Sequence, residues 1–264
     1  LELEYLGQVS EPYTPTEIAG NRFRIVLREM THAEVEQAET AIAQVHETGL
    51  PNYFDDQRFG SLGISGEWIA RAWCLGHWER ALWLALADPH PNDSSSDRHE
   101  KKLLNESWGH WSECQQWLEQ PQRRSVVTYM SDKVKSGRDP DYRGALARIS
   151  VDLRGLYLSA WQSAIWNRLL TRYLEAACSV NSLYSFHLAS GRCVFPVQRM
   201  TEEESQLLQS ELPLPCSRIE RPEGLVGDLL DRVLQEEQIE LRQIRVKYPR
   251  DSFFSKGRRK VIVN

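Results

Sequence analysis

Residues 49–60, GLPNYFDDQRFG, combine side chains that together could hold an unpaired nucleobase. Phe54 offers a flat apolar ring on a turn bounded by glycine and proline, and the amides of Asn52 and Gln57 can donate and accept hydrogen bonds. Arg58 adds a cation that can reach a phosphate. Unstacked bases are recognised by stacking on aromatic rings and by hydrogen bonds along their edges. The alternative is that these aromatic rings are core residues, which is the commoner role of Phe.

Basic residues are concentrated in two segments, although the 264-residue chain has a net charge of −5. Residues 241–264 carry eight Lys/Arg against one Asp, and residues 121–150 carry seven Lys/Arg against three Asp. Clustered cations are typical of phosphate contacts, and a solvated surface is the alternative. We therefore predict that both segments face one groove, with Arg258, Arg259 and Lys260 contacting RNA phosphates.

Several functional classes are disfavoured by the composition. The longest apolar run, in residues 79–88, is far shorter than the ~20 residues that a membrane span needs. Five cysteines without a CxxC pair indicate free thiols in a reducing cytosol. The seven histidines are scattered, and no GxGxxG, P-loop or HExxH motif is present. We expect a cytoplasmic protein with no membrane contact and no metal.

The elements that position residues 49–60 are predicted from hydrophobic spacing and turn residues. Alternation of apolar and polar residues over 21–29 predicts a strand with one apolar face. Thr31 and Glu34 then form a capping box that opens an amphipathic helix, which Gly49 is placed to end.

The rest of the chain also indicates a mixture of helices and strands. The predicted elements are a Trp-rich helix over 66–87, a polar loop over 89–100, a buried helix over 156–178, a hairpin over 183–197 turning at Ser190–Gly191, a helix over 225–234 and a strand near 239–246. No repeat of 20–50 residues is visible, which disfavours a solenoid.

The stretch at 49–60 closely resembles the signature G-V-P-N-Y-F-G-x-Q-R-F-G of the tRNA pseudouridine synthase D (TruD) family. Other landmarks of the family occur in the same order. They are GNRFRIVLRE at 20–29, LYLSAWQSAIWNRLL at 156–170, ELPLPCSR at 211–218 and GRRKVIV at 257–263. The resemblance covers nearly the whole chain, and it favours the binding interpretation of residues 49–60.

The resemblance implies an enzyme that isomerises a uridine of tRNA (uridine-13 in the family) to pseudouridine without an added cofactor. The base must leave the RNA stack, be cut from its ribose, turn and be rejoined through carbon. Asn52 would help to position the catalytic carboxylate, and Phe54 would pack against the target base. The turn behind them would be shaped by Gln57, Arg58, Phe59 and Gly60. The expected partner is tRNA, and the protein is expected to be a monomer.

The resemblance also implies an α/β (α+β) fold with two domains. Residues 1–75 would form part of a pseudouridine-synthase catalytic domain with a mixed sheet. Residues 76–255 would form a large α/β TRUD-type insertion domain, and residues 256–264 would return to the catalytic domain as a strand.

This sequence departs from the family pattern at the catalytic residue. The family's catalytic aspartate lies in a G-x-K-D-[KR]-x-A motif upstream of the strand at 21–29, and nothing like it occurs here. Asp55 and Asp56 do not match it, so the catalytic residue stays unassigned. Asp55 replaces the signature's usual glycine, at a turn that can require unusual backbone angles.

The family's strands after Val263 are missing as well, and we expect a fragment of a longer synthase that is inactive alone. The alternative is a degenerate relative, a non-catalytic RNA-binding module. A GxKDxxA motif encoded upstream of Leu1 would favour the fragment, and a start codon there would favour the module.

Overall fold

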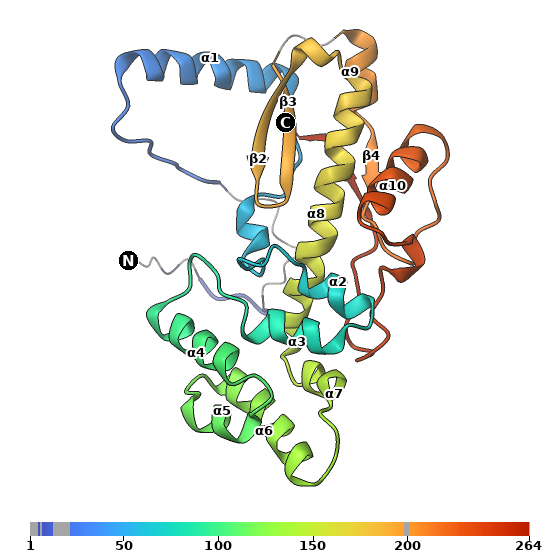
Figure 1. Cartoon of the computed structure of the whole chain (residues 1–264). Coiled ribbons are helices and arrows are strands. Elements are labelled where there is room, and N and C mark those ends of the chain that lie inside the picture. Colours follow the sequence, from blue (N-terminus) through green and yellow to red (C-terminus); the bar gives the residue numbers. More distant parts are fainter. Residues whose placement is uncertain (1–4, 6, 13–21, 198–200, 264) are drawn as a thin grey trace. The chain divides into compact units, whose positions relative to one another are not determined.

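The computed structural model of the chain describes residues 5, 7–12, 22–197 and 201–263. Figure 1 shows the course of the chain through its helices and strands. The chain divides into two compact units, Leu1–Gln44 and Val45–Asn264. All residues predicted to bind RNA belong to the second unit.

The first unit contains an extended segment followed by the start of helix α1 (His32–Thr48). The predicted capping box is confirmed, because Thr31 N donates to Glu34 Oε2 at 2.7 Å and Glu34 N donates to Thr31 Oγ1 at 3.4 Å. Gly49, with φ 71°, follows the end of the helix as predicted.

The strand predicted over 21–29 is wrong for the residues that the structure describes. Residues 22–29 have no regular secondary structure, and the apolar side chains of Phe23 and Ile25 are 79% and 80% exposed. A strand needs a neighbour for its backbone hydrogen bonds, and none of the described strands pairs with this segment. Alternation alone therefore did not determine its conformation.

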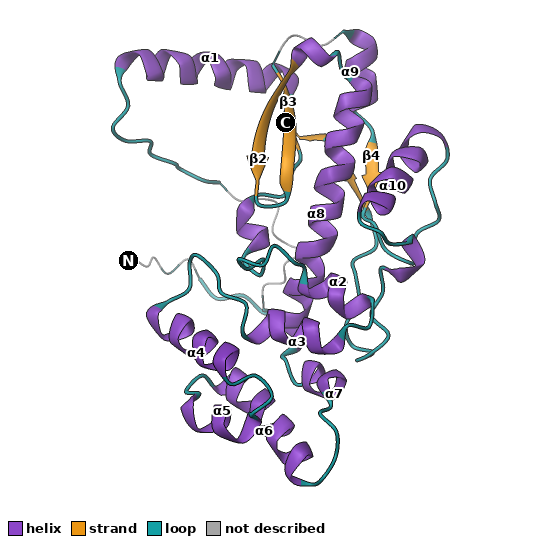
Figure 2. Cartoon of the chain, viewed as in Figure 1, coloured by secondary structure: helices purple, strands orange, loops and turns teal. Residues whose placement is uncertain are grey.

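The second unit is built around helix α8 (Val151–Ala177), in agreement with the helix predicted over 156–178. Ser150 caps it, with Oγ accepting from Leu153 N at 3.4 Å. Seventeen of its 27 residues are buried, so it is covered on most of its faces and forms the centre of the core. The predicted hairpin packs against it, and so do the helices α2 (Ile69–Cys74), α9 (Glu202–Leu208) and α10 (Gly224–Glu236). Figure 2 shows that helices dominate this unit and that strands are few.

Two predicted boundaries change within the helical part. The helix predicted over 66–87 is two helices, α2 (Ile69–Cys74) and α3 (Trp78–Leu86), separated by Gly76 at φ 81°. A left-handed residue cannot continue an α-helix, and glycine adopts that conformation without a Cβ clash. The loop predicted over 89–100 ends early, because Ser94 caps α4 (Ser95–Glu106) by accepting from Asp97 N at 3.0 Å.

The remaining helices are short or of ordinary length. They are α5 (Trp111–Trp117), α6 (Pro121–Lys135), α7 (Tyr142–Ala147), α9 (Glu202–Leu208) and α10 (Gly224–Glu236), with 3-10 turns η2 (Asp56–Phe59), η3 (Val180–Ser182) and η4 (Leu241–Gln243). The strand predicted near 239–246 is wrong, since η4 occupies its middle. Ile239 and Ile244 are buried on either side of that turn, so their apolar character reflects anchoring of a loop.

The described strands form three two-stranded antiparallel ladders. In the predicted hairpin, β2 (Leu183–Leu188) pairs with β3 (Gly191–Pro196), and Leu188 opposite Gly191 places the turn at Ala189–Ser190, one residue earlier than predicted. Segments far apart in sequence form the other two ladders. They are β1 (Leu50–Pro51) with β6 (Ile262–Val263), and β4 (Glu211–Pro213) with β5 (Arg258–Lys260).

The predicted mixture of α and β is confirmed in its coarse form, with helices predominating. Among the described residues no sheet exceeds two strands, so the mixed sheet of a catalytic domain stays a prediction. The domain boundaries at residues 75 and 255 also stay predictions.

Candidate nucleobase-binding site

The signature turn has ordinary backbone geometry. Asp55 has φ −81° and ψ 166°, and its Oδ1 accepts from Asp56 N at 2.7 Å, which caps η2. Asp55 therefore does not occupy the left-handed region, and the unusual backbone angles considered for this position are absent. Asp56 Oδ1 accepts from Ala189 N at 2.7 Å and ties η2 to the turn of the hairpin.

Helix α8 fixes the backbone of Phe54 through one buried amide. Phe54 N donates to Asn167 Oδ1 at 2.9 Å, and Asn167 Nδ2 donates to Phe54 O at 2.8 Å. Asn167 is 1% exposed, and its Nδ2 also donates to Ser190 Oγ at 3.0 Å. The Phe54 ring meets Trp166 edge to face, with centroids 5.7 Å apart. Asn167 and Trp166 lie in the segment recognised at 156–170, but their contacts with Phe54 were not predicted.

Two guanidinium groups lie over the half-buried ring of Phe54. The Cζ atom of Arg259 is 3.9 Å from the ring centroid, and that of Arg58 is 5.4 Å from it. Such cation–π contacts are worth about 0.5–2 kcal/mol. Burial lowers the pKa of Arg259, and the charge of Arg58 lowers that pKa further. The ring is therefore flanked by positive charge, which suits a phosphate or an electron-rich base.

Asn52 joins the signature to β5 and holds Arg259 in place. Arg259 donates to Asn52 Oδ1 at 2.6 Å and to Asn52 O at 3.2 Å. Asn52 Nδ2 donates to Lys260 O at 3.0 Å, and Asn52 N donates to Val261 O at 2.9 Å. An amide nitrogen has two hydrogens, so one Nδ2 hydrogen remains for a further acceptor.

Phe59 and Gly60 follow the turn and play different parts. Phe59 is 2% exposed and packs edge to face on Trp68 with centroids 5.7 Å apart, so its ring belongs to the core. Gly60 has φ −60° and ψ −7°, and a Cβ there would meet no heavy atom within 4 Å. Neither backbone strain nor crowding requires glycine at this position.

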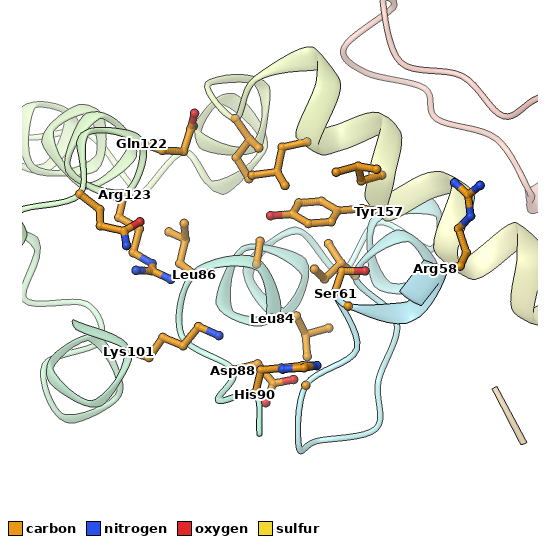
Figure 3. A pocket seen from close by; sticks show the side chains of 18 of the residues that line it. Arg58, Ser61, Leu84, Leu86, Asp88, His90, Lys101, Gln122, Arg123 and Tyr157 are labelled. Carbon is orange, nitrogen blue, oxygen red and sulfur yellow. The ribbon is translucent and has the colours of Figure 1, made fainter. Parts of the chain in front are cut away.

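A cavity of about 370 Å³ adjoins the turn, and Gln57 and Arg58 reach it. Its wall continues over α3, α6 and the first turns of α8. Figure 3 shows Arg58 at one side of this pocket, Tyr157 across its middle and Arg123 at the other side. The volume falls in the range of about 300–1,000 Å³ that is typical of small-molecule sites.

The basic residues predicted to contact phosphates differ in their exposure and in the partners that they already have. Arg258 and Lys260 are exposed on β5, and Arg258 donates to Glu211 O at 2.6 Å. Arg259 is occupied by Asn52 and Phe54. In the other basic segment, Arg123 is paired with Asp97 at 2.9 Å and Glu100 at 3.0 Å. A common groove for both segments stays a prediction.

The chain belongs to the family described as tRNA pseudouridine synthase D (TruD), whose model matches residues 1–264. It is 32% identical to the tRNA pseudouridine synthase D of Geobacter metallireducens, over 84% of this chain. It is 28% identical, over 91% of this chain, to a Methanococcus maripaludis protein named "Probable tRNA pseudouridine synthase D 1". These two matches cover 55% and 61% of the relatives' own lengths.

The fold also matches a crystal structure of a Methanosarcina mazei protein assigned to TruD. The TM-score is 0.63 at 21% identity, covering 87% of this chain and 55% of that protein. This likeness shows a shared fold. None of the helices among the described residues has the length and apolar character needed to cross a membrane.

Proposed function

We propose that the protein acts in the isomerisation of a tRNA uridine to pseudouridine and that residues 52–60 hold the target base. The observation that carries the proposal is the Phe54 platform. Its backbone is fixed by Asn167, its ring edge rests on Trp166, and two guanidinium groups flank the ring. A rigid aromatic beside cations is the arrangement that binds an extruded base together with its phosphate.

The signature residues take distinct roles in this proposal. Phe54 contacts the base, and the remaining Nδ2 hydrogen of Asn52 is available to a catalytic carboxylate. Gln57 and Arg58 form the side of the site that faces the cavity. Phe59 supports the turn from the core, and Gly60 ends η2.

Arg259 has to change partners if it contacts a phosphate. In the structure its guanidinium packs on Phe54 and donates twice to Asn52. We infer that the incoming uridine replaces it on the ring, while Arg259 turns to the phosphate with the exposed Arg258 and Lys260 beside it. The cation–π contact and the two hydrogen bonds to Asn52 are exchanged for charge-assisted hydrogen bonds to the phosphate.

The proposed division into a catalytic part (1–75 and 256–264) and an insertion (76–255) is supported by strand pairing. Leu50 and Pro51 pair with Val263 and Ile262, which joins the two ends of the proposed catalytic part.

The 264-residue chain alone is expected to bind RNA without converting it. The two acids of the signature are engaged with backbone amides, Asp55 with Asp56 N and Asp56 with Ala189 N, each at 2.7 Å. No GxKD motif occurs in the sequence to supply the family's aspartate. The non-catalytic alternative predicts the same binding but no pseudouridine from any longer product of the gene.

The test uses a tRNA transcript, with fluorescence anisotropy for binding and mass spectrometry for pseudouridine. Phe54→Ala is expected to weaken binding about 5- to 150-fold, the equivalent of ~1–3 kcal/mol of stacking. Trp117→Ala, which removes an exposed aromatic ring (58% exposed) on α5, is the matched control and should bind as wild type does. Equal binding by Phe54→Ala would refute the base-holding role. Pseudouridine formed by the chain alone would instead direct the search for a nucleophile to Asp55 and Asp56.

A further inference from the structure

The cavity beside the signature has walls suited to a flat ring. Leu84 and Leu86 of α3 and Ile149, before α8, are all less than 5% exposed and line it. The Tyr157 ring from α8 lies across the same space, as Figure 3 shows. These surfaces are apolar and largely removed from solvent, so they favour an uncharged ligand with a planar body.

The hydroxyl of Tyr157 is a polar group beside these apolar surfaces. The residue is 7% exposed, and its hydroxyl makes no hydrogen bond to the described residues but stays open to the cavity. In Figure 3 the hydroxyl oxygen points into the pocket, toward the side where Arg123 and Leu86 lie. Water can hydrate this hydroxyl in the cavity, and a ligand that offers an acceptor would take over that hydrogen bond.

The charges around the cavity argue against an anion. Lys101 is paired with Asp93 at 2.7 Å, and Arg123 is paired with both Asp97 and Glu100. The cations at this end are therefore neutralised by carboxylates within hydrogen-bond distance. The favoured ligand is neutral and planar, and it presents a carbonyl acceptor to Tyr157.

The cavity begins where the proposed uridine site ends. Arg58 lies over the Phe54 ring and also lines the cavity, and Gln57 lines it as well. A strand of RNA whose uridine meets Phe54 would thus bring its next nucleotide to the mouth of the cavity.

We propose that this cavity binds a second nucleobase of the same RNA, the immediate neighbour of the base held by Phe54. The ring inserts between Leu84, Leu86 and Tyr157, and a carbonyl oxygen of the base accepts from the Tyr157 hydroxyl. The inference rests on the proposed function, because it places the RNA through Phe54.

The experiment uses the full chain and pentaribonucleotides with a central uridine. One member is intact, and two others carry an abasic nucleotide immediately before or after the uridine. For the wild type, one abasic position is expected to weaken binding about 5- to 100-fold and the other to have little effect. Tyr157→Phe and Leu156→Trp should each reduce that difference. Leu156 is 55% exposed and lines the cavity, so the larger side chain can obstruct it without disturbing the core.

Tyr142→Phe is the matched control. It removes a hydroxyl that bonds Glu79 at 2.9 Å outside the cavity, and it should leave the abasic difference unchanged. Tyr157→Phe should melt close to the wild-type temperature, because the hydroxyl it removes makes no hydrogen bond to the described residues.

Three results would overturn the inference. If both abasic positions bind as the intact RNA does, the cavity takes no base. If Tyr157→Phe and Leu156→Trp keep the wild-type difference, the base binds elsewhere. In either case binding that still depends on Phe54 leaves the proposed function standing. If Phe54→Ala binds the intact pentamer as tightly as wild type, the proposed function falls and this inference falls with it.

Discussion

Replacement of Asn167 by Ala tests whether one buried amide holds the signature in place. The substitution removes the hydrogen bonds to Phe54 N, Phe54 O and Ser190 Oγ. Phe54 is only half-buried, so water can reach its freed backbone groups and each costs about 1 kcal/mol, the lower end of the usual range. With the bond to Ser190 at about 0.5–1.5 kcal/mol, the free energy of unfolding should fall by about 2–4 kcal/mol. For a unit of this size that corresponds to a Tm lowered by about 5–15 °C.

Gln162→Ala is the matched control on the same helix. Gln162 is 3% exposed and donates from Nε2 to Pro215 O at 3.0 Å and Ser255 O at 2.8 Å, away from the signature. Its loss should lower the free energy of unfolding by a similar amount, about 1–3 kcal/mol. A stability measurement alone would not separate the two variants.

Hydrogen exchange of the Phe54 amide separates them. In Asn167→Ala this amide should lose its protection, because its acceptor is gone, whereas in Gln162→Ala it should exchange as in the wild type. The reasoning is refuted if the Phe54 amide stays protected in Asn167→Ala, or if both variants expose it equally.

Three further predictions concern the aromatic, basic and acidic groups. Phe59→Ala should cost about 3–5 kcal/mol in chemical denaturation, whereas Phe54→Ala should cost less stability and chiefly weaken RNA binding; the reverse order would show that Phe54 is the core residue. Arg258→Ala combined with Lys260→Ala should weaken RNA binding and flatten the salt dependence of log K by up to about 1.4, since up to two fewer phosphates are neutralised; an unchanged slope would identify both as solvated surface. The hydrogen bond from Ser94, and then that from Arg123, lowers the pKa of Asp97 in the folded protein below the usual 3.8. The ionised carboxylate therefore stabilises the fold fully above about pH 3.8, and this stabilisation is lost as the pH falls through the pKa of the folded state. Asp97→Asn should therefore be less stable than wild type at pH 7 but lose less stability as the pH falls. Acid unfolding curves of the two proteins, followed by circular dichroism, would contradict this if they had the same shape and separation throughout.

The sequence predicted local structure correctly where both partners of an interaction are close together in the chain. The residues of the capping box, Thr31 and Glu34, lie within one helical turn, and Gly49 follows the end of the same helix, so both features could be predicted from the sequence. The break at Gly76 was readable in principle, but the surrounding tryptophans continue a helical period and obscured it. The segment 21–29 shows the limit, because a strand exists only with a partner and alternation does not supply one.

The signature itself was located from sequence, but its supports were not. Arg259 reaches Asn52 from 207 positions along the chain, and Asn167 reaches Phe54 from 113. All three residues of the basic run at 258–260 were therefore predicted to contact phosphates, although Arg259 packs on an aromatic ring in the structure. Tyr157 lies in the helix predicted over 156–178, but its exposure to a cavity depends on residues far away in sequence and was not predicted.

The pairing of Asn52 with β5 also sets when the site can form during synthesis. Asn52 Nδ2 binds the carbonyl of Lys260, which is made 208 residues later. At about 5–20 residues per second the ribosome takes roughly 10–40 s to reach it. Throughout that interval Phe54 lacks the guanidinium of Arg259, and the edge of β1 is open to other strands. The nascent chain therefore carries the Phe54 turn without Arg259 until β1 pairs with β6, which is the period when a chaperone or a competing strand would meet it.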